Sequence, residues 1–459
     1  MEKKQAIEAG LAARAGLRLV GFGVAVAVAA ACGSGSQPTP AVTSTEPTTA
    51  ATTSTAVGAS SIEGVSGEAR SLLDSWRSAV LHSGGVWPGY DLAAIPTVLV
   101  SLDVDGRVVT VVAFNHPNPE ALGSEIRHID VDGHQVAVIG QVADPERLAS
   151  MAPFDFFADV GGADTFVLVG QRGEPGREPG TPEFIAMVVH EAFHRYQFDE
   201  WVPDTVSQDV AGYDFSPENL ELVLLENRIL IAAYQADRLS ETERLGRQFA
   251  AVRAARHQRD PRMVLDEQQE RMEGSARWIE HGIGDAIGNL YTSTNHTSEL
   301  GLLDQNLDDP TAVLGSVKSF FGFGRFYSSG ATQLALLDRL DVSGIDVAQR
   351  LRNGDTPAQL LAQRVEPLED VEALVVAART EHDPEGQLGR EAANLAELAA
   401  GEEAPSFGGG DDAPDTSAGG FELTDDQIAC LQDHGLDLSG DAFTIPEEVD
   451  RACFGETEP

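Results

Sequence analysis

The pattern of apolar and polar residues divides the chain into a strand-rich first part and a helical second part. In the first part, two runs rich in valine and leucine flank an Asp-Gly dipeptide at residues 105–106, which is typical of a β-hairpin turn. Further β-branched runs and one stretch with helical spacing surround this hairpin. We therefore expect a small mixed or antiparallel sheet. Its predicted segments are a helix over 68–81, a hairpin over 96–115 and strands over 133–142 and 164–171.

From Thr181 onward, the spacing of apolar residues predicts mostly helices. Thr181 can cap the first of these helices, since Pro182 follows at the first helical position and Glu183 lies in the first turn. The Ser-Pro pair at 216–217 starts a second, long helix in the same way. The fold class is therefore α+β, with a sheet followed by a mainly helical part. Further helices are predicted over residues 241–259, 265–287 and 328–340.

Composition separates a globular region, residues 67–382, from its flanking segments. Residues 32–66 are rich in threonine, serine and proline and contain almost no large apolar residue, so we expect a flexible tether. Residues 383–420 include an acidic, glycine-rich stretch that predicts a linker. Residues 421–459 have helical pieces and two cysteines, and predict a small C-terminal appendage.

Residues 1–31 have the pattern of an export signal. Basic residues precede an apolar run that is too short for a comfortable membrane span and fits a signal peptide. The small residues 29–31, followed by Cys32, resemble a bacterial lipoprotein signal, which implies cleavage before Cys32 and lipid on its sulfur. Plain secretion is the alternative. The protein is thus expected to be exported, either anchored by lipid to the outer face of the cytoplasmic membrane or secreted.

The two remaining cysteines, Cys430 and Cys453, both lie near the C-terminus. An exported protein meets oxidising conditions, so these residues are predicted to close a small loop by a disulfide. Two free thiols are the alternative.

The overall charge argues against a nucleic-acid partner. Acidic residues outnumber basic residues 73 to 31, which gives a formal net charge of −42. A surface this negative repels the phosphates of DNA and RNA. The chain also lacks a Walker loop, a dinucleotide-binding glycine pattern and a G-x-S-x-G nucleophile motif.

The sequence His-Glu-Ala-Phe-His at residues 190–194 carries the main chemical signal. On a helix, His190 and His194 lie one turn apart on one face and can aim two imidazoles at one point. Neutral imidazole is a zinc ligand, and Glu191 can reach a water on the open side of such a metal and take its proton. The pattern predicts one zinc ion per chain with Glu191 as general base. A helix whose histidines are only structural is the alternative.

A catalytic zinc site needs a third protein ligand. The metzincin pattern is absent, because Gln197 and Glu200 stand where that pattern has glycine and its third ligand. Glu273 is the best candidate, since the small residues at 274–276 permit close approach of two helices. An ordinary helix ion pair with Arg277 is the alternative role for Glu273. Rival third ligands are Glu226, Glu270 and Glu280.

The motif and the segment 273–280 together resemble the gluzincin-type zinc metallopeptidases. The segment is similar to the family's E-G-x-A-x-(aromatic)-x-E pattern, with Trp278 at the aromatic position and Glu280 at the last one. This resemblance, over roughly residues 160–340, implies a zincin-like fold with its active site between the sheet and the helical part. It also implies a sheet-edge strand beside the metal helix, for which residues 164–171 are the candidate. Tyr327 is the implied oxyanion donor, and a packed core tyrosine is the alternative.

The sequence therefore predicts a cell-surface zinc metallopeptidase that acts on a peptide or protein substrate. The first alternative is a non-catalytic binding or scaffold lipoprotein on a peptidase-like fold. The intact residues His190, Glu191 and His194 argue against it, because loss of one would suffice to end catalysis. The second alternative is a structural metal site. Structural zinc prefers four protein ligands and more cysteine, and no cysteine lies between residues 33 and 429.

Overall fold

The computed structural model describes the globular region and leaves out both ends of the chain. All described residues belong to the first of two units, residues 1–407. The expected signal peptide, nearly all of the tether, the C-terminal appendage and the three cysteines Cys32, Cys430 and Cys453 lie outside the described residues. The described residues are 64–151, 153–203, 213–259, 263–289, 296–297, 300–301, 314, 316–365, 368 and 370–402.

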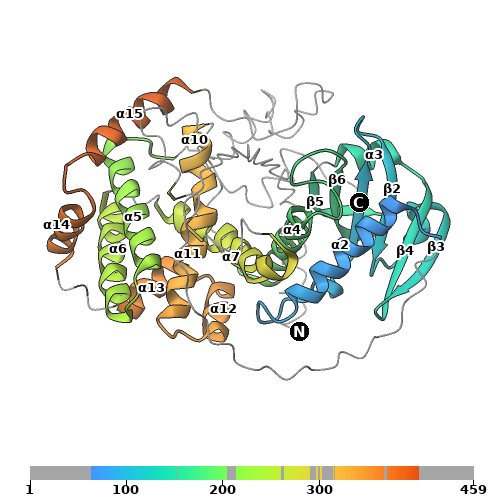
Figure 1. Cartoon of the computed structure of the whole chain (residues 1–459), viewed down its shortest axis with the longest axis horizontal. Coiled ribbons are helices and arrows are strands. Elements are labelled where there is room, and N and C mark those ends of the chain that lie inside the picture. Colours follow the sequence, from blue (N-terminus) through green and yellow to red (C-terminus); the bar gives the residue numbers. More distant parts are fainter. Residues whose placement is uncertain are drawn as a thin grey trace, which may run out of the picture. The chain divides into compact units, whose positions relative to one another are not determined.

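A six-stranded mixed sheet forms the N-terminal part of this region (Figure 1). The strand order is β3-β4-β2-β1-β6-β5, in which β1 and β6 are parallel and all other neighbours are antiparallel. The predicted hairpin is confirmed as β1 and β2, and Gly106 in its turn has a φ of +76°, which favours glycine. The strands are β1 (Thr97–Leu102), β2 (Val108–Phe114), β3 (Gly123–Val131), β4 (His134–Val142), β5 (Phe154–Val160) and β6 (Ala163–Gln171).

The central strands are apolar on both faces because both faces of the sheet are covered. Leu99 and Phe166 pack on one face in the main core, which also contains residues of helices α2 (Gly67–Ser83) and α4 (Pro182–Glu200). Val100 and Val169 pack on the other face against the short helix α3 (Pro145–Ser150). A continuous run of valine and leucine is typical of a strand buried on both sides.

The two strands that the sequence pattern does not reveal, β3 and β5, are the two edges of the sheet. Half-exposed edge strands carry polar side chains, such as Arg127 and Asp130 in β3, which weaken the hydrophobic signal. The expectation that residues 164–171 form the edge strand is wrong. These residues form β6, which lies inside the sheet, and β5 is the edge next to it.

The predicted helix starts are confirmed. Thr181 Oγ1 accepts a hydrogen bond from the Phe184 N–H at 3.2 Å, and Ser216 Oγ accepts one from the Asn219 N–H at 3.3 Å. Two helices, α5 and α6, account for the long interval between the histidine motif and Glu273. The helices after α4 are α5 (Pro217–Gln235), α6 (Leu239–Arg259), α7 (Val264–Ile287), α10 (Val317–Ser319), α11 (Arg325–Arg339), α12 (Gly344–Arg352), α13 (Pro357–Val365), α14 (Val371–His382) and α15 (Leu388–Gly401).

The structure differs from the predicted boundary at residue 383. Residues 388–401, inside the expected linker, form helix α15, whose buried side chains belong to the main core and whose contacts include α5. Its apolar positions recur at helical spacing, which the acidic composition of the surrounding segment obscures. The rest of the predicted linker, residues 403–420, lies outside the described residues. The buried positions are Leu388, Ala392, Leu395 and Ala399.

Helices α5, α6, α7 and α11 are joined by a buried ion network of three arginines and three carboxylates. Arg256 illustrates its geometry, since its guanidinium lies 2.7 Å from Glu226 Oε2 and 2.6 Å from Asp266 Oδ2. Isolated charges are costly in the protein interior, so each one here depends on its partners. The network therefore links the facing sides of these four helices through paired charges. Its members are Glu226, Arg253, Arg256, Asp266, Glu270 and Arg325.

Helix α7 also meets α11 at a glycine contact. A Cβ atom on Gly274 would lie 2.4 Å from Gly330 Cα, and one on Gly330 would lie 2.4 Å from the Glu270 carbonyl oxygen. Only glycine fits at both positions. The close approach expected after Glu273 is present, but the partner at Gly274 is α11, whereas the neighbouring Ser275 faces α4.

We expect Arg256→Met to lower the free energy of unfolding by about 3–5 kcal/mol, because it removes one of the two arginines that each of the buried carboxylates Glu226 and Asp266 contacts. The measurement is urea unfolding followed by circular dichroism. Arg244→Met is the matched control, because this arginine pairs with Glu241 at the surface and its side chain is 39% exposed. It should change the free energy by at most about 1 kcal/mol. Equal losses in both variants would contradict a network that depends on burial.

Candidate metal site

Helix α4 presents its two motif histidines to α7. The helix begins at the Thr181 cap, and its apolar residues, among them Phe184 and Val188, are buried in the main core. Because residues four apart lie on one face, His190 and His194 project together from this helix. In Figure 1, α4 and α7 lie between the sheet and the α5–α6 pair, so the site is positioned by both parts of the fold.

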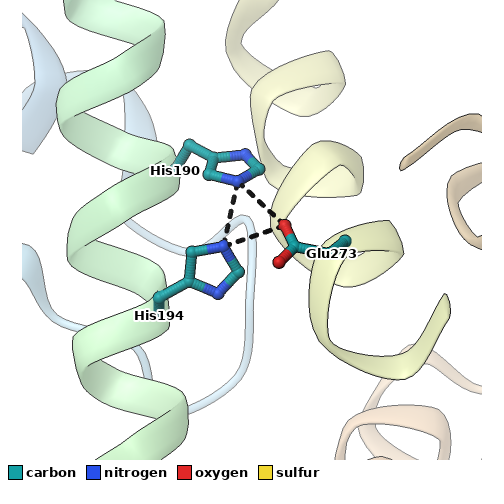
Figure 2. Close-up of side chains that lie close together, drawn as sticks. All are labelled: His190, His194 and Glu273. Atoms are coloured by element: carbon teal, nitrogen blue, oxygen red, sulfur yellow. Dashed lines mark hydrogen bonds and ion pairs between the residues drawn. The ribbon is translucent and has the colours of Figure 1, made fainter. Parts of the chain in front are cut away.

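Three side chains converge between α4 and α7 (Figure 2). His190 Nε2 and His194 Nε2 are 3.0 Å apart. Glu273 Oε2 lies 3.5 Å from the first nitrogen and 3.2 Å from the second. The three residues are only 4%, 5% and 7% exposed, respectively. Among the described residues this is the one cluster of histidine, cysteine or acidic side chains close enough to share a metal ion.

The spacing of these three atoms fits a zinc ion. Zinc binds histidine nitrogen and carboxylate oxygen at about 2.0–2.2 Å, so tetrahedral ligand atoms are separated by about 3.3–3.5 Å. The observed separations of 3.0, 3.2 and 3.5 Å are near this value. Two imidazoles and one carboxylate also form the ligand set of several catalytic zinc sites, in which the fourth position takes water. The donor set therefore fits a metal with an open position.

Gln197 orients His194 from one helical turn away. The Gln197 amide oxygen lies 2.6 Å from His194 Nδ1 and accepts its proton in a hydrogen bond, which leaves the unprotonated Nε2 with its lone pair toward the cluster. The same amide donates hydrogen bonds to Met272 O at 3.0 Å and to Ser275 Oγ at 2.8 Å. One buried side chain thus fixes a candidate ligand and joins α4 to α7. The sequence analysis missed this role, although position i+3 from a ligand on the same helix is a usable signal.

Glu280 has the corresponding place beside His190. Its Oε1 lies 2.6 Å from His190 Nδ1 in a close ion-pair contact whose angle departs from that of a linear hydrogen bond. Arg277 pairs with the same carboxylate. This arrangement turns His190 Nε2 toward the cluster, as carboxylate partners do for metal-bound histidines. Glu280 is therefore a partner of the candidate ligand His190, whereas the sequence analysis left it open as a rival ligand.

The charges around the histidines favour a cation at the centre. Burial lowers the pKa of His190, but the adjacent carboxylates of Glu280 and Glu273 outweigh this effect and raise the pKa to about 10. Burial raises the pKa of Glu273, and the two histidines outweigh that effect and hold its pKa well below the usual range. Both shifts have one cause, since a buried carboxylate and a buried imidazole stabilise the charged forms of each other.

Glu191 and Tyr327 complete the surroundings of the triad. Glu191 is partly buried, and burial raises its pKa to about 7. The Tyr327 ring stacks on the His190 ring with centroids 5.5 Å apart and an angle of 24° between the planes. Burial and the charge of Glu273 raise the pKa of Tyr327 well above its usual value, so its hydroxyl remains a hydrogen-bond donor. The Tyr327 ring thus lies against the cluster, and Glu191 is near enough for its charge to interact with both histidines.

The rival third ligands lie elsewhere. Glu226 and Glu270 belong to the buried ion network, where both bind Arg253. Arg277, the alternative partner proposed for Glu273, pairs with Glu280 instead. Glu273 is therefore the carboxylate that the fold brings to the two histidines.

Comparison with protein-family models, with curated proteins and with solved structures finds no match. None of the helices in the described ranges combines the length and the apolar composition that a membrane crossing requires. The functional argument for this chain thus depends on the geometry of the site.

We expect Gln197→Ala to weaken zinc binding roughly 10–100-fold, because His194 loses the partner that fixes its ring. The measurement is a competition titration against a chromophoric chelator, with thermal unfolding of the metal-free protein in parallel. Gln349→Ala is the control, since this glutamine is exposed on α12. Unchanged zinc affinity in Gln197→Ala would show that His194 is oriented by packing alone.

Proposed function

We propose that this protein is a zinc-dependent metallopeptidase. The observation that carries the proposal is the convergence of His190 Nε2, His194 Nε2 and Glu273 Oε2 within a buried cluster. Glu191 follows His190 in the chain, and the Tyr327 ring stacks on the His190 ring. This combination provides three metal ligands, a base and a hydrogen-bond donor, which are the groups that peptide hydrolysis requires. A purely structural metal site needs neither the base nor the donor.

The mechanism assigns one task to each side chain. His190, His194 and Glu273 would hold the zinc ion, which would supply a Lewis acid for the peptide carbonyl and would lower the pKa of a water molecule. Glu191 takes a proton from this water as its oxygen attacks the carbonyl carbon. Glu191 then delivers the proton to the amine nitrogen as the C–N bond breaks. Tyr327 donates a hydrogen bond to the oxygen that becomes negative during the attack.

The fold is consistent with a zincin-like architecture, which is part of the proposal. A sheet-bearing part precedes a helical part. The candidate site lies on α4, the helix that follows the sheet, and on α7, the third helix after α4. The export signal in residues 1–31 supports a place outside the cytoplasm, with a lipid on Cys32 as the proposed membrane anchor. A peptidase in that place would meet peptides or proteins of the cell envelope or its surroundings.

We expect the protein lacking residues 1–60 to bind about one zinc ion per chain and to cleave a mixed peptide library. Glu191→Gln should keep the zinc but lower the rate roughly 10²–10⁴-fold, because the general base is removed. The double variant His190→Ala/His194→Ala should lose the zinc. Zinc content is measured by elemental analysis and cleavage by mass spectrometry.

Glu183→Gln is the control for this experiment, because Glu183 is exposed in the first turn of the same helix. It should leave both zinc content and rate unchanged. The proposal would be contradicted if the wild-type protein took up no zinc after incubation with the metal. It would also be contradicted if Glu191→Gln cleaved peptides at the wild-type rate.

We expect Tyr327→Phe to lower kcat roughly 10²-fold while KM changes little, because the hydroxyl acts on the oxyanion that forms only during reaction. Steady-state kinetics on one cleaved peptide provide the measurement. Tyr196→Phe is the control, since the Tyr196 hydroxyl bonds the Pro88 carbonyl oxygen at 3.4 Å and lies in the core. An unchanged kcat in Tyr327→Phe would assign this tyrosine to packing.

A further inference from the structure

Aromatic side chains gather beside the candidate metal site on the side of the sheet edge. The Phe156 ring, from β5, meets the His194 ring at a centroid distance of 5.8 Å. Phe198, one turn after His194 on α4, lies 5.3 Å from Phe156 and 5.6 Å from Phe157. Phe154 adds a fourth ring, 5.0 Å from Phe156. We call Phe154, Phe156, Phe157 and Phe198 the aromatic cluster.

The aromatic cluster is not part of the sealed core. Phe157 is 43% exposed, and the other three rings are partly buried. By contrast, the neighbouring core rings Phe166, Phe184 and Phe193 are fully buried. A partly exposed group of rings that touches a metal ligand offers apolar surface to whatever occupies the site.

The edge strand β5, which carries three of these four rings, is closed to backbone pairing near the candidate metal site. β5 has a bulge between Asp155 and Ala158, where its register with β6 shifts. There the Phe156 carbonyl oxygen accepts a hydrogen bond from Arg195 Nη1 at 2.7 Å, and the Phe157 N–H donates to Asp155 Oδ1 at 2.8 Å. Side chains of this chain therefore occupy backbone groups that an added strand would need.

Two further contacts keep the edge closed. Arg147 Nη2 donates to the Asp159 carbonyl oxygen at 2.7 Å, so a second arginine caps β5 beyond the bulge. Arg195 is held in place by Asp164 at 3.1 Å and by Asp199 at 2.8 Å. Its guanidinium also lies 4.3 Å from the centroid of the Phe157 ring. These contacts fix the cap and the ring together.

We propose that the site selects its peptide through the aromatic cluster, which takes one bulky apolar side chain next to the metal, and not through strand addition to β5. The inference rests on the proposed peptidase function and names its substrate class. The His194 ring lies 5.8 Å from the Phe156 ring and 6.4 Å from the Phe198 ring, which places that side chain near the reacting bond. Affinity then depends on one side chain of the peptide, whereas strand addition would make it depend on the backbone.

The test measures binding without cleavage. Zinc-loaded Glu191→Gln protein is titrated into fluorescein-labelled glycine-serine octapeptides that carry one central phenylalanine or, in the matched peptide, one alanine. Fluorescence anisotropy gives the two dissociation constants. We expect the phenylalanine peptide to bind at least roughly tenfold more tightly than the alanine peptide. Adding Phe157→Ala should reduce the ratio of the two dissociation constants to about two or less. Phe198→Ala, the second variant, should reduce this ratio as well.

Val109→Ala is the matched control, because Val109 is also an exposed apolar residue, 44% exposed, but lies on β2 with β1 and β6 between it and β5. It should leave the ratio unchanged. Equal binding of the two peptides, or a ratio that survives both phenylalanine substitutions, would overturn the proposal. Wild-type cleavage of the same peptides is measured separately, so a selective binder that cleaves nothing would overturn the peptidase function and leave this inference standing.

Discussion

The hydrogen bonds of Gln197 are the constraint on which the candidate site depends. A metal triad that draws ligands from two helices requires a fixed distance between those helices and a fixed rotation of each one. Gln197 meets both requirements, because its amide contacts His194 on its own helix and Met272 and Ser275 on α7. Since every polar atom of this amide is used inside the protein, a shift of either helix would leave a buried group unpaired.

Helix α7 is held from its other sides by contacts of a different kind. The glycine contact between Gly274 and Gly330 sets the distance to α11, and the buried ion network anchors Asp266 and Glu270 one to two turns before Glu273. Close packing and paired charges thus act on the same helix that supplies the third ligand. These contacts of α7 with the other helices therefore orient the Glu273 side chain toward the two histidines.

Local patterns predicted most elements and part of the site. The i, i+4 spacing of His190 and His194 is decided within one helix, and so are the caps at Thr181 and Ser216. The choice of Glu273 over Glu226 and Glu270 rests on the small residues at 274–276 and on a resemblance, because the chain alone does not show which carboxylates meet arginines in the fold. The edge position of β5 and the packing of α15 depend on residues distant in sequence, which periodicity does not report.

The sequence separation of 79 positions from His194 to Glu273 has a consequence for how the protein is made. A nascent chain that ends after α6 already contains both histidines but lacks the carboxylate. In the proposed zinc site, full affinity for the metal would arise only after α7 has emerged and packed against α4. Tight metal binding would therefore require that α5, α6 and α7 have folded. A metal added before α7 is present would meet only the two histidines and would bind weakly.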